Sequence, residues 1–319
     1  MELHKLLHKS KQELFRSGIK TADLDVKVLL RHTLEQDDVF LISHPEALIT
    51  NAQYQKFRRL IRRRKKGEPV GYLTGHKEFY GLDFIVNKNV LVPRPETETL
   101  VEKAIEFIKL KVYQVYKVDP RKQEPINQLS NQPISILDIG TGSGCIIVSL
   151  AKNLFLPPFS PLQPTTYNLQ PVLYASDICP KALKVAKVNA KKHDVYNNIQ
   201  FYKSDLFENK KLPKKFDLII ANLPYLDPSR KDKVHEKPET MGLSFEPHHA
   251  LYANNNGFEL VERLVKLLPQ KLAEDGIALL EIDETQNKIL TELCKQTSLK
   301  VEPIENSTNW SGFFKISQH

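Results

Sequence analysis

The sequence predicts an α/β fold with a mostly parallel sheet, preceded by a small helical domain. Residues 1–67 have apolar residues at helical spacing and no strand-like alternation, whereas short apolar strands alternate with amphipathic helices from residue 134 onward. Between them lies a β-prone, Pro-ended stretch. Because alternating strands and helices require crossover connections, the strands run parallel with helices on both faces. We expect a helical domain over 1–67, a β-hairpin linker over 68–95 and a larger domain over 96–319.

The composition excludes several classes of protein. Of 319 residues, 41% are hydrophobic and 26% are charged, as in a folded globular protein. No apolar run reaches the roughly 20 residues that span a bilayer, and the first 20 residues resemble neither a signal nor a transit peptide. The scattered Cys145, Cys179 and Cys294 fit a reducing compartment. We therefore expect a cytoplasmic monomer without membrane contact, and the histidine spacing predicts no metal site.

A basic stretch, KFRRLIRRRKK at residues 56–66, contributes to the net charge of +8. One interpretation is a patch that meets an acidic or RNA-bound partner. The other is a helix with a cationic last turn, which suits the negative end of the helix dipole. Tyr54, Phe57, Leu60 and Ile61 fall on one helical face, which favours the second interpretation.

The larger domain is predicted element by element from its apolar pattern. Strands are expected at 134–140, 172–177, 199–207, 216–222 and 277–283, and helices at 96–112, 144–154, 180–193, 257–276 and 284–296. Two segments rich in Pro, Gln and Asn, 111–132 and 155–171, fit neither pattern and are expected to be mobile surface insertions.

The first predicted strand ends in LDIGTGSGC, residues 137–145. Glycines in this position let the chain turn tightly into a helix and let a ligand approach where a Cβ would clash. The spacing departs from the dinucleotide pattern G-x-G-x-x-G, and a tight turn without a ligand is the alternative. The residues expected to bind a cofactor here are Asp138, Gly140, Thr141, Gly142, Ser143 and Gly144.

Two further carboxylates end the next two strands, at the same edge of the sheet. Asp177 can accept hydrogen bonds from both hydroxyls of a ribose. Asp205 is expected to meet the edge of an adenine ring, with Leu206 as an apolar wall. Open α/β sheets bind ligands in this crevice, so glycines and acids at consecutive strand ends predict a nucleoside-containing ligand.

The segments LDIGTGSG, SD, SDLF and NLPY, in this order, resemble a class I S-adenosylmethionine-dependent methyltransferase that modifies amino groups. GEPVGYLTGHKEFYGLDFIVNKNVLVPRPETETLVE, FEPHHALYANNNGFEL and LLEIDETQ resemble more specifically the protein-(glutamine-N5) methyltransferases of peptide chain release factors, the HemK or PrmC family. The resemblance implies a Rossmann-like, seven-stranded sheet and S-adenosyl-L-methionine as cofactor. It also implies a substrate, the glutamine of the Gly-Gly-Gln motif in class 1 release factors.

The motif NLPY, residues 222–225, is expected to orient a planar amide nitrogen. The Asn222 side-chain oxygen, which also borders the cofactor, and the Leu223 carbonyl can each accept one N–H. Pro224 stiffens the turn, and the Tyr225 ring can flank the substrate. The family has proline where Leu223 stands, but the main-chain carbonyl remains. A turn that merely ends a buried strand is the alternative.

Other functions fit parts of the pattern. An adenine-N6 methyltransferase also needs a motif of this kind, although the helical domain and PRPETE linker argue against it, so no stable nucleic-acid binding is expected. A ribosomal-protein glutamine is a third related target. A hypothesis of a different class is that the protein is not an enzyme but a docking module with a methyltransferase fold, and only Leu223 suggests it.

Overall fold

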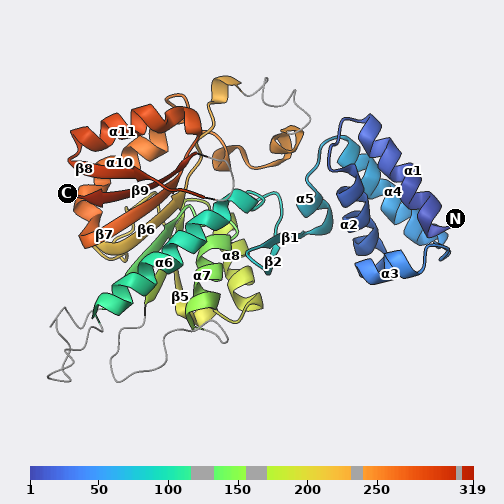
Figure 1. Cartoon of the computed structure of the whole chain (residues 1–319), viewed down its shortest axis with the longest axis horizontal. Coiled ribbons are helices and arrows are strands. Elements are labelled where there is room, and N and C mark those ends of the chain that lie inside the picture. The colour runs from blue at the N-terminus through green and yellow to red at the C-terminus, as the bar shows by residue number, and fades with distance from the viewer. Residues whose placement is uncertain (116–132, 156–170, 231–239, 307–310) are drawn as a thin grey trace.

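The computed structural model describes residues 1–115, 133–155, 171–230, 240–306 and 311–319. A helical domain at the N-terminus is joined through a hairpin to a larger domain built on a seven-stranded sheet (Figure 1). Six of the seven strands point in the same direction, and the strand Phe313–Gln318 (β9) is antiparallel to both of its neighbours. The predicted fold class is therefore confirmed.

Five helices precede the hairpin: α1 (Leu3–Arg16), α2 (Ala22–Leu34), α3 (Asp38–Ser43), α4 (Asn51–Lys65) and α5 (Val70–Thr74). Their apolar faces share one core, which includes Phe57 and Ile61 of α4 and Leu73 of α5. The basic stretch occupies the C-terminal part of α4, with Arg62, Arg63, Arg64 and Lys65 in the last turn, and several of its cations pair with carboxylates. The ion pairs are Arg58–Glu13, Arg63–Glu68, Arg64–Asp25 and Lys65–Glu13. This arrangement supports the helix-end interpretation of the stretch.

The large domain follows the hairpin strands β1 (His76–Phe79) and β2 (Leu82–Ile85). Its strands are β3 (Ser135–Ile139), β4 (Val172–Asp177), β5 (Ile199–Lys203), β6 (Phe216–Asn222), β7 (Leu272–Glu281), β8 (Leu299–Pro303) and β9 (Phe313–Gln318), in the spatial order β5-β4-β3-β6-β7-β9-β8. Its long helices are α6 (Glu98–Val115), α7 (Cys145–Phe155), α8 (Pro180–Lys192), α10 (Glu259–Lys271) and α11 (Asn287–Gln296). After β3 the chain adds β4 and β5 on one side and then β6 and β7 on the other side. Sheets of this kind bind ligands in the crevice at the carboxyl ends of the strands where the order reverses.

Helices cover both faces of this sheet. One core contains the inner faces of α6, α7 and α8, and the other contains those of α10 and α11. Successive residues of β6 point alternately into the two cores: Leu218 and Ile220 into the first, Ile219 and Ala221 into the second. Burial on both sides explains why the central strands read as continuous apolar runs.

Three predicted boundaries are wrong. The helix expected over 257–276 ends at Lys271, because Leu272 pairs with Phe216 and begins β7. The left-handed φ of 53° at Asp275 then breaks any helix. The strand expected over 199–207 ends at Lys203, and the expected helix at 96–112 continues to Val115 into the first expected insertion. The remainder of the insertions, 116–132 and 156–170, lies outside the described residues.

The described residues lack two features, a membrane-spanning helix and a metal-binding cluster. None of their helices has both the length and the apolar composition needed to cross a bilayer. The same residues contain no group of three or more His, Cys, Asp or Glu side chains arranged to hold a metal ion.

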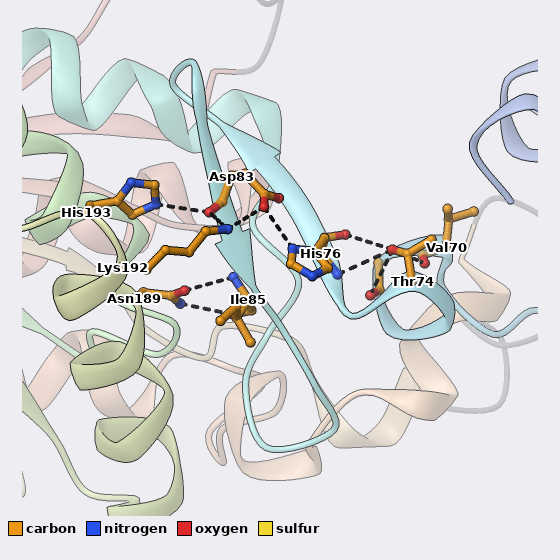
Figure 2. A network of polar contacts seen from close by, with 9 residues as sticks. Val70, Thr74, His76, Asp83, Ile85, Asn189, Lys192 and His193 are labelled. Carbon is orange, nitrogen blue, oxygen red and sulfur yellow. Dashed lines mark hydrogen bonds and ion pairs between the residues drawn. The ribbon is translucent and has the colours of Figure 1, made fainter. Parts of the chain in front are cut away.

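The hairpin is fastened to α8 by a polar network (Figure 2). The fully buried Asn189 accepts a hydrogen bond from the Ile85 N–H at 2.8 Å and donates to the Ile85 carbonyl at 3.0 Å. Its Nδ2 also donates to the Ser143 carbonyl at 2.8 Å. Lys192 pairs with the Asp83 side chain, and His76 binds the same carboxylate at 2.8 Å. Asn189 thus ties β2 to the glycine-containing loop that follows β3.

We expect Asn189→Ala to lower the free energy of unfolding of the large domain by roughly 2 to 4 kcal/mol, because it leaves backbone groups of the partly buried Ile85 and the buried Ser143 without their partner. Denaturant titration measures the change. Asn153→Ala is the matched control, since the Asn153 side chain donates to the Ser149 carbonyl of its own helix, and it should change stability by about 0.5 kcal/mol or less. Equal effects of the two variants would contradict the anchoring role.

Candidate active site

A cavity of about 450 Å³ opens at the carboxyl edge of the sheet. Ten residues singled out in the sequence line it: Gly140, Thr141, Gly142, Ser143, Asp177, Asp205, Leu206, Asn222, Leu223 and Pro224. The other three, Asp138, Gly144 and Tyr225, are not among its lining residues. Segments that are far apart in the sequence therefore meet here, because the carboxyl ends of parallel strands share one edge.

The glycine loop, residues 140–144, turns the chain from β3 into α7. Gly140 and Gly142 have φ of 72° and 56°, a region in which other residues are strained. The N–H groups of Gly140 and Thr141 both donate to the Ser176 carbonyl, at 2.8 and 2.9 Å, which holds the loop against the end of β4. A Cβ on Gly140 would lie 3.0 Å from Leu223 Cδ2, so the loop and the NLPY turn are in close contact.

Asp177 connects the loop to the cavity. Its Oδ2 accepts from the Gly142 N–H at 2.9 Å, and its Oδ1 accepts from the Cys179 N–H at 2.8 Å. Burial raises the pKa of this carboxyl, while the two N–H groups act against that rise. Each carboxylate oxygen has more than one lone-pair site, so Asp177 can still accept hydrogen bonds from a ligand in the cavity.

The third carboxylate has a partner that the sequence did not reveal. Asp205 Oδ2 lies 2.9 Å from a guanidinium nitrogen of Arg263 on α10, and both residues line the cavity. Leu206 adopts a φ of 45°, which turns the chain away from β5 at this point. Asp205 is thus placed beside the cavity as expected, but it is already paired with a cation.

Asp138 lies beneath the loop and is 1% exposed. The Thr141 hydroxyl donates to its Oδ2 at 2.6 Å. Burial raises the pKa of Asp138 to about 7, and the negative charge of Asp177 adds to the rise. The carboxyl therefore supports the loop from inside the fold and stays protonated up to about neutral pH.

This pKa predicts a pH dependence of stability. An unfolded Asp ionises near pH 4, so between about pH 4 and 7 the folded chain binds more protons than the unfolded chain, and stability falls as pH rises. The free energy of unfolding of the wild type falls between pH 5 and pH 8. We expect this fall to be smaller in Asp138→Asn, by about 2 to 4 kcal/mol. Denaturant titrations at the two pH values measure it. Asp23→Asn, which alters a largely exposed side chain, should show the same dependence of stability on pH as the wild type. If Asp138→Asn also shows the wild-type dependence, the raised pKa of Asp138 is refuted.

The NLPY turn forms the part of the cavity wall that adjoins the loop. Asn222 ends β6, and its Nδ2 donates to the Thr97 hydroxyl at 3.1 Å, which leaves the side-chain oxygen for the cavity that both residues line. Leu223 is 7% exposed and packs in the core on the α10 side of the sheet. The Tyr225 hydroxyl donates to Glu281 Oε1 at 3.3 Å, behind the cavity wall.

Sequence reasoning missed several residues that frame this site. Glu281 is 3% exposed, and its burial raises the pKa of the carboxyl to about 7. The available signal was a glutamate flanked by Leu280 and Ile282 within the apolar run 277–282. Arg94 pairs with the buried Glu246, whose other oxygen accepts from the Val92 N–H at 2.9 Å. Further lining residues are Thr97, His248, His249 and Tyr252.

The chain also resembles known proteins in sequence. The model of the PrmC N-terminal domain matches residues 5–75, and a methyltransferase domain model matches residues 130–306. The release factor glutamine methyltransferase of Koribacter versatilis is 33% identical over 281 residues, which cover 88% of this chain and 86% of that protein. The chain belongs to the release factor glutamine methyltransferase family. The resemblance noted in the sequence is thereby confirmed.

Other members and relatives of this family match at similar levels. The release factor glutamine methyltransferase of Rhodopirellula baltica is 35% identical over 84% of this chain and 79% of its own. The bifunctional methyltransferase of Rickettsia typhi is 35% identical over 89% of this chain, which spans about half (51%) of that protein. Among solved structures, the catalytic domain of hMettl16 is 12% identical, with a TM-score of 0.50 over 84% of this chain and 81% of that chain, and it shares the fold.

Proposed function

We propose that this protein transfers a methyl group from S-adenosylmethionine to the side-chain nitrogen of the glutamine in the Gly-Gly-Gln motif of class 1 release factors. The observation that carries the proposal is the position of Asn222 and Leu223, which line the same cavity as the glycine loop and Asp177. Membership of the release factor glutamine methyltransferase family supports the substrate.

The residues present suit S-adenosylmethionine. A side chain at Gly142 would be strained at a φ of 56°, and its Cβ would meet only the Gly140 carbonyl oxygen at 3.8 Å, so the glycine loop leaves room there for a ligand. The Asp177 carboxylate supplies acceptors for ribose hydroxyls, and Leu206 and Ile178 supply apolar surface in the same cavity. A volume of about 450 Å³ fits a ligand of nucleoside size plus a small side chain. When bound, the cofactor supplies an electrophilic methyl group on a sulfonium.

The chain itself must make an amide nitrogen reactive. The lone pair of a primary amide is delocalised into its carbonyl, so the nitrogen is a poor nucleophile. Two acceptors in a fixed arrangement, the Asn222 oxygen and the Leu223 carbonyl, can hold the two N–H groups and stabilise the positive charge that develops on nitrogen. The replacement of the family proline by Leu223 preserves this carbonyl, and packing of the leucine against Gly140 and the core limits its freedom.

The alternatives fit less well. The match to the PrmC N-terminal domain supports a release factor over a nucleic acid as substrate, and Arg58, Arg63, Arg64 and Lys65 of the basic stretch are engaged by carboxylates of the same domain. A docking module without activity would not need Asn222 and Asp177 at one cavity.

A methyl-transfer assay tests the proposal. Labelled S-adenosylmethionine is offered with a purified class 1 release factor, with its Gln→Ala variant in the Gly-Gly-Gln loop, and with nucleic acid. We expect label on the wild-type factor alone. Label on nucleic acid would indicate adenine chemistry, and cofactor binding without any transfer would favour the docking module.

A further inference from the structure

A buried polar chain lies directly behind Asn222. Asn222 and Glu281 are register neighbours at the carboxyl ends of the parallel strands β6 and β7. Thr97, from the turn before α6, contacts both: its hydroxyl lies 2.7 Å from Glu281 Oε2 and 3.1 Å from Asn222 Nδ2. Thr97 and Glu281 are each 3% exposed, so neither can exchange these partners freely for bulk water.

The hydrogen bonds in this chain have a direction. A hydroxyl has one hydrogen, and Thr97 donates it to Glu281. The Thr97 oxygen can then only accept from Asn222, so Asn222 must turn its NH₂ group toward Thr97 and its oxygen away. The reversed side-chain amide would present an N–H donor to the N–H donors of a substrate amide and could not bind them.

We infer that Thr97 and Glu281 are positioning residues that hold the Asn222 amide with its oxygen toward the substrate. This inference rests on the proposed function, in which that oxygen accepts an N–H of the glutamine. It also assigns a task to the PRPETE segment, residues 93–98, because Thr97 belongs to it. The turn that leads from the linker into α6 thus completes the wall of the active site.

The protonation state of Glu281 matters for this chain. An ionised carboxylate can only accept hydrogen bonds. A protonated carboxyl can donate to Thr97, which can then donate to Asn222, so the hydrogen bonds can run in the opposite direction. Burial raises the pKa of Glu281 to about 7, so ionisation, and with it the productive orientation, is expected to increase as pH rises through neutrality. The titratable groups that interact electrostatically with Glu281 are Glu96, Tyr225 and Cys145, and Tyr225 in turn interacts with Arg94 and Asp283.

A pair of substitutions at Thr97 separates the hydroxyl from the volume of the side chain. Thr97→Val keeps the shape and removes the hydroxyl, and we expect it to lower kcat about 10- to 100-fold, with KM for the release factor and Kd for S-adenosylmethionine within about threefold. Thr97→Ser restores the hydroxyl and should rescue most of kcat. Thr99→Val, which alters a buried threonine two residues away, is the matched control. An unchanged kcat in Thr97→Val, or an equal loss in Thr97→Ser, would overturn the inference.

The pH profile tests the second residue. Wild-type kcat should fall below about pH 7, whereas Glu281→Gln cannot titrate and should lose this acidic limb whatever its absolute rate. Should the variant keep the acidic limb of the wild type, Glu281 would have no part in orienting Asn222.

An NMR measurement decides the orientation without any substrate. In full-length protein with labelled asparagine, the Asn222 side-chain NH₂ signals are identified by their loss in Asn222→Asp. We expect slow hydrogen exchange of these signals in wild type and Thr97→Ser, and exchange about tenfold faster or more in Thr97→Val. Equally fast exchange in wild type and Thr97→Val would overturn the inference. If wild-type protein methylates no release factor, the proposed function fails, while the exchange data still decide how Asn222 is held.

Discussion

Asn222→Ala is expected to lower the rate of methyl transfer to a release factor about 100-fold or more, with the dissociation constant of S-adenosylmethionine changed only several-fold. The variant removes an acceptor for the substrate amide, and it leaves the glycine loop and Asp177 intact. Single-turnover kinetics gives the rate, and calorimetry gives the affinity. Because Asn222 ends a strand and its side chain is only partly buried, the fold should tolerate the change.

Two controls make this result interpretable. Asn153→Ala, in α7, removes an asparagine that donates to the Ser149 carbonyl of its own helix and does not line the cavity, and it should retain the wild-type rate. A thermal melt shows whether Asn222→Ala is folded. A folded variant with the wild-type rate would remove Asn222 from the mechanism.

Asp177→Ala is expected to raise the dissociation constant of S-adenosylmethionine about 10- to 100-fold, which corresponds to about 1.4 to 2.7 kcal/mol. The substitution removes the acceptors for ribose hydroxyls and also frees the Gly142 N–H, which Asp177 holds at 2.9 Å. Calorimetric titration measures the constant. Asp23→Ala, in the helical domain and paired with Lys11 and Lys27, is the control and should leave it unchanged. An unchanged constant in Asp177→Ala would refute the ribose role.

Much of the sheet could be predicted from the sequence, because strands buried on both faces are continuous apolar runs and their order follows from crossover rules. The ends of elements were harder to predict. Ala273 and Glu274 suit a helix in isolation, yet Leu272 pairs with Phe216 and the backbone at Asp275 is left-handed. Tertiary pairing overrode local propensity there.

The front of the site was predictable and the back was not. Glycines and acids at strand ends carry local patterns, so the loop and Asp177 could be recognised from a few residues each. The bonds from Thr97 to Glu281 and from Asn222 to Thr97 join residues 184 and 125 positions apart. Nothing local to Glu281 indicates which strand lies beside it, and the pairing of Asp205 with Arg263 depends equally on where α10 packs.

The register of β7 beside β6 also has a consequence for synthesis. The helical domain has its own apolar core, built from residues 3–73, so it can fold early as the chain emerges from the ribosome. The wall behind Asn222 needs Glu281, near the C-terminal end of the large domain. A nascent chain therefore has its helical domain well before it has a catalytic centre, and a chain that terminates before β7 would retain the first without the second.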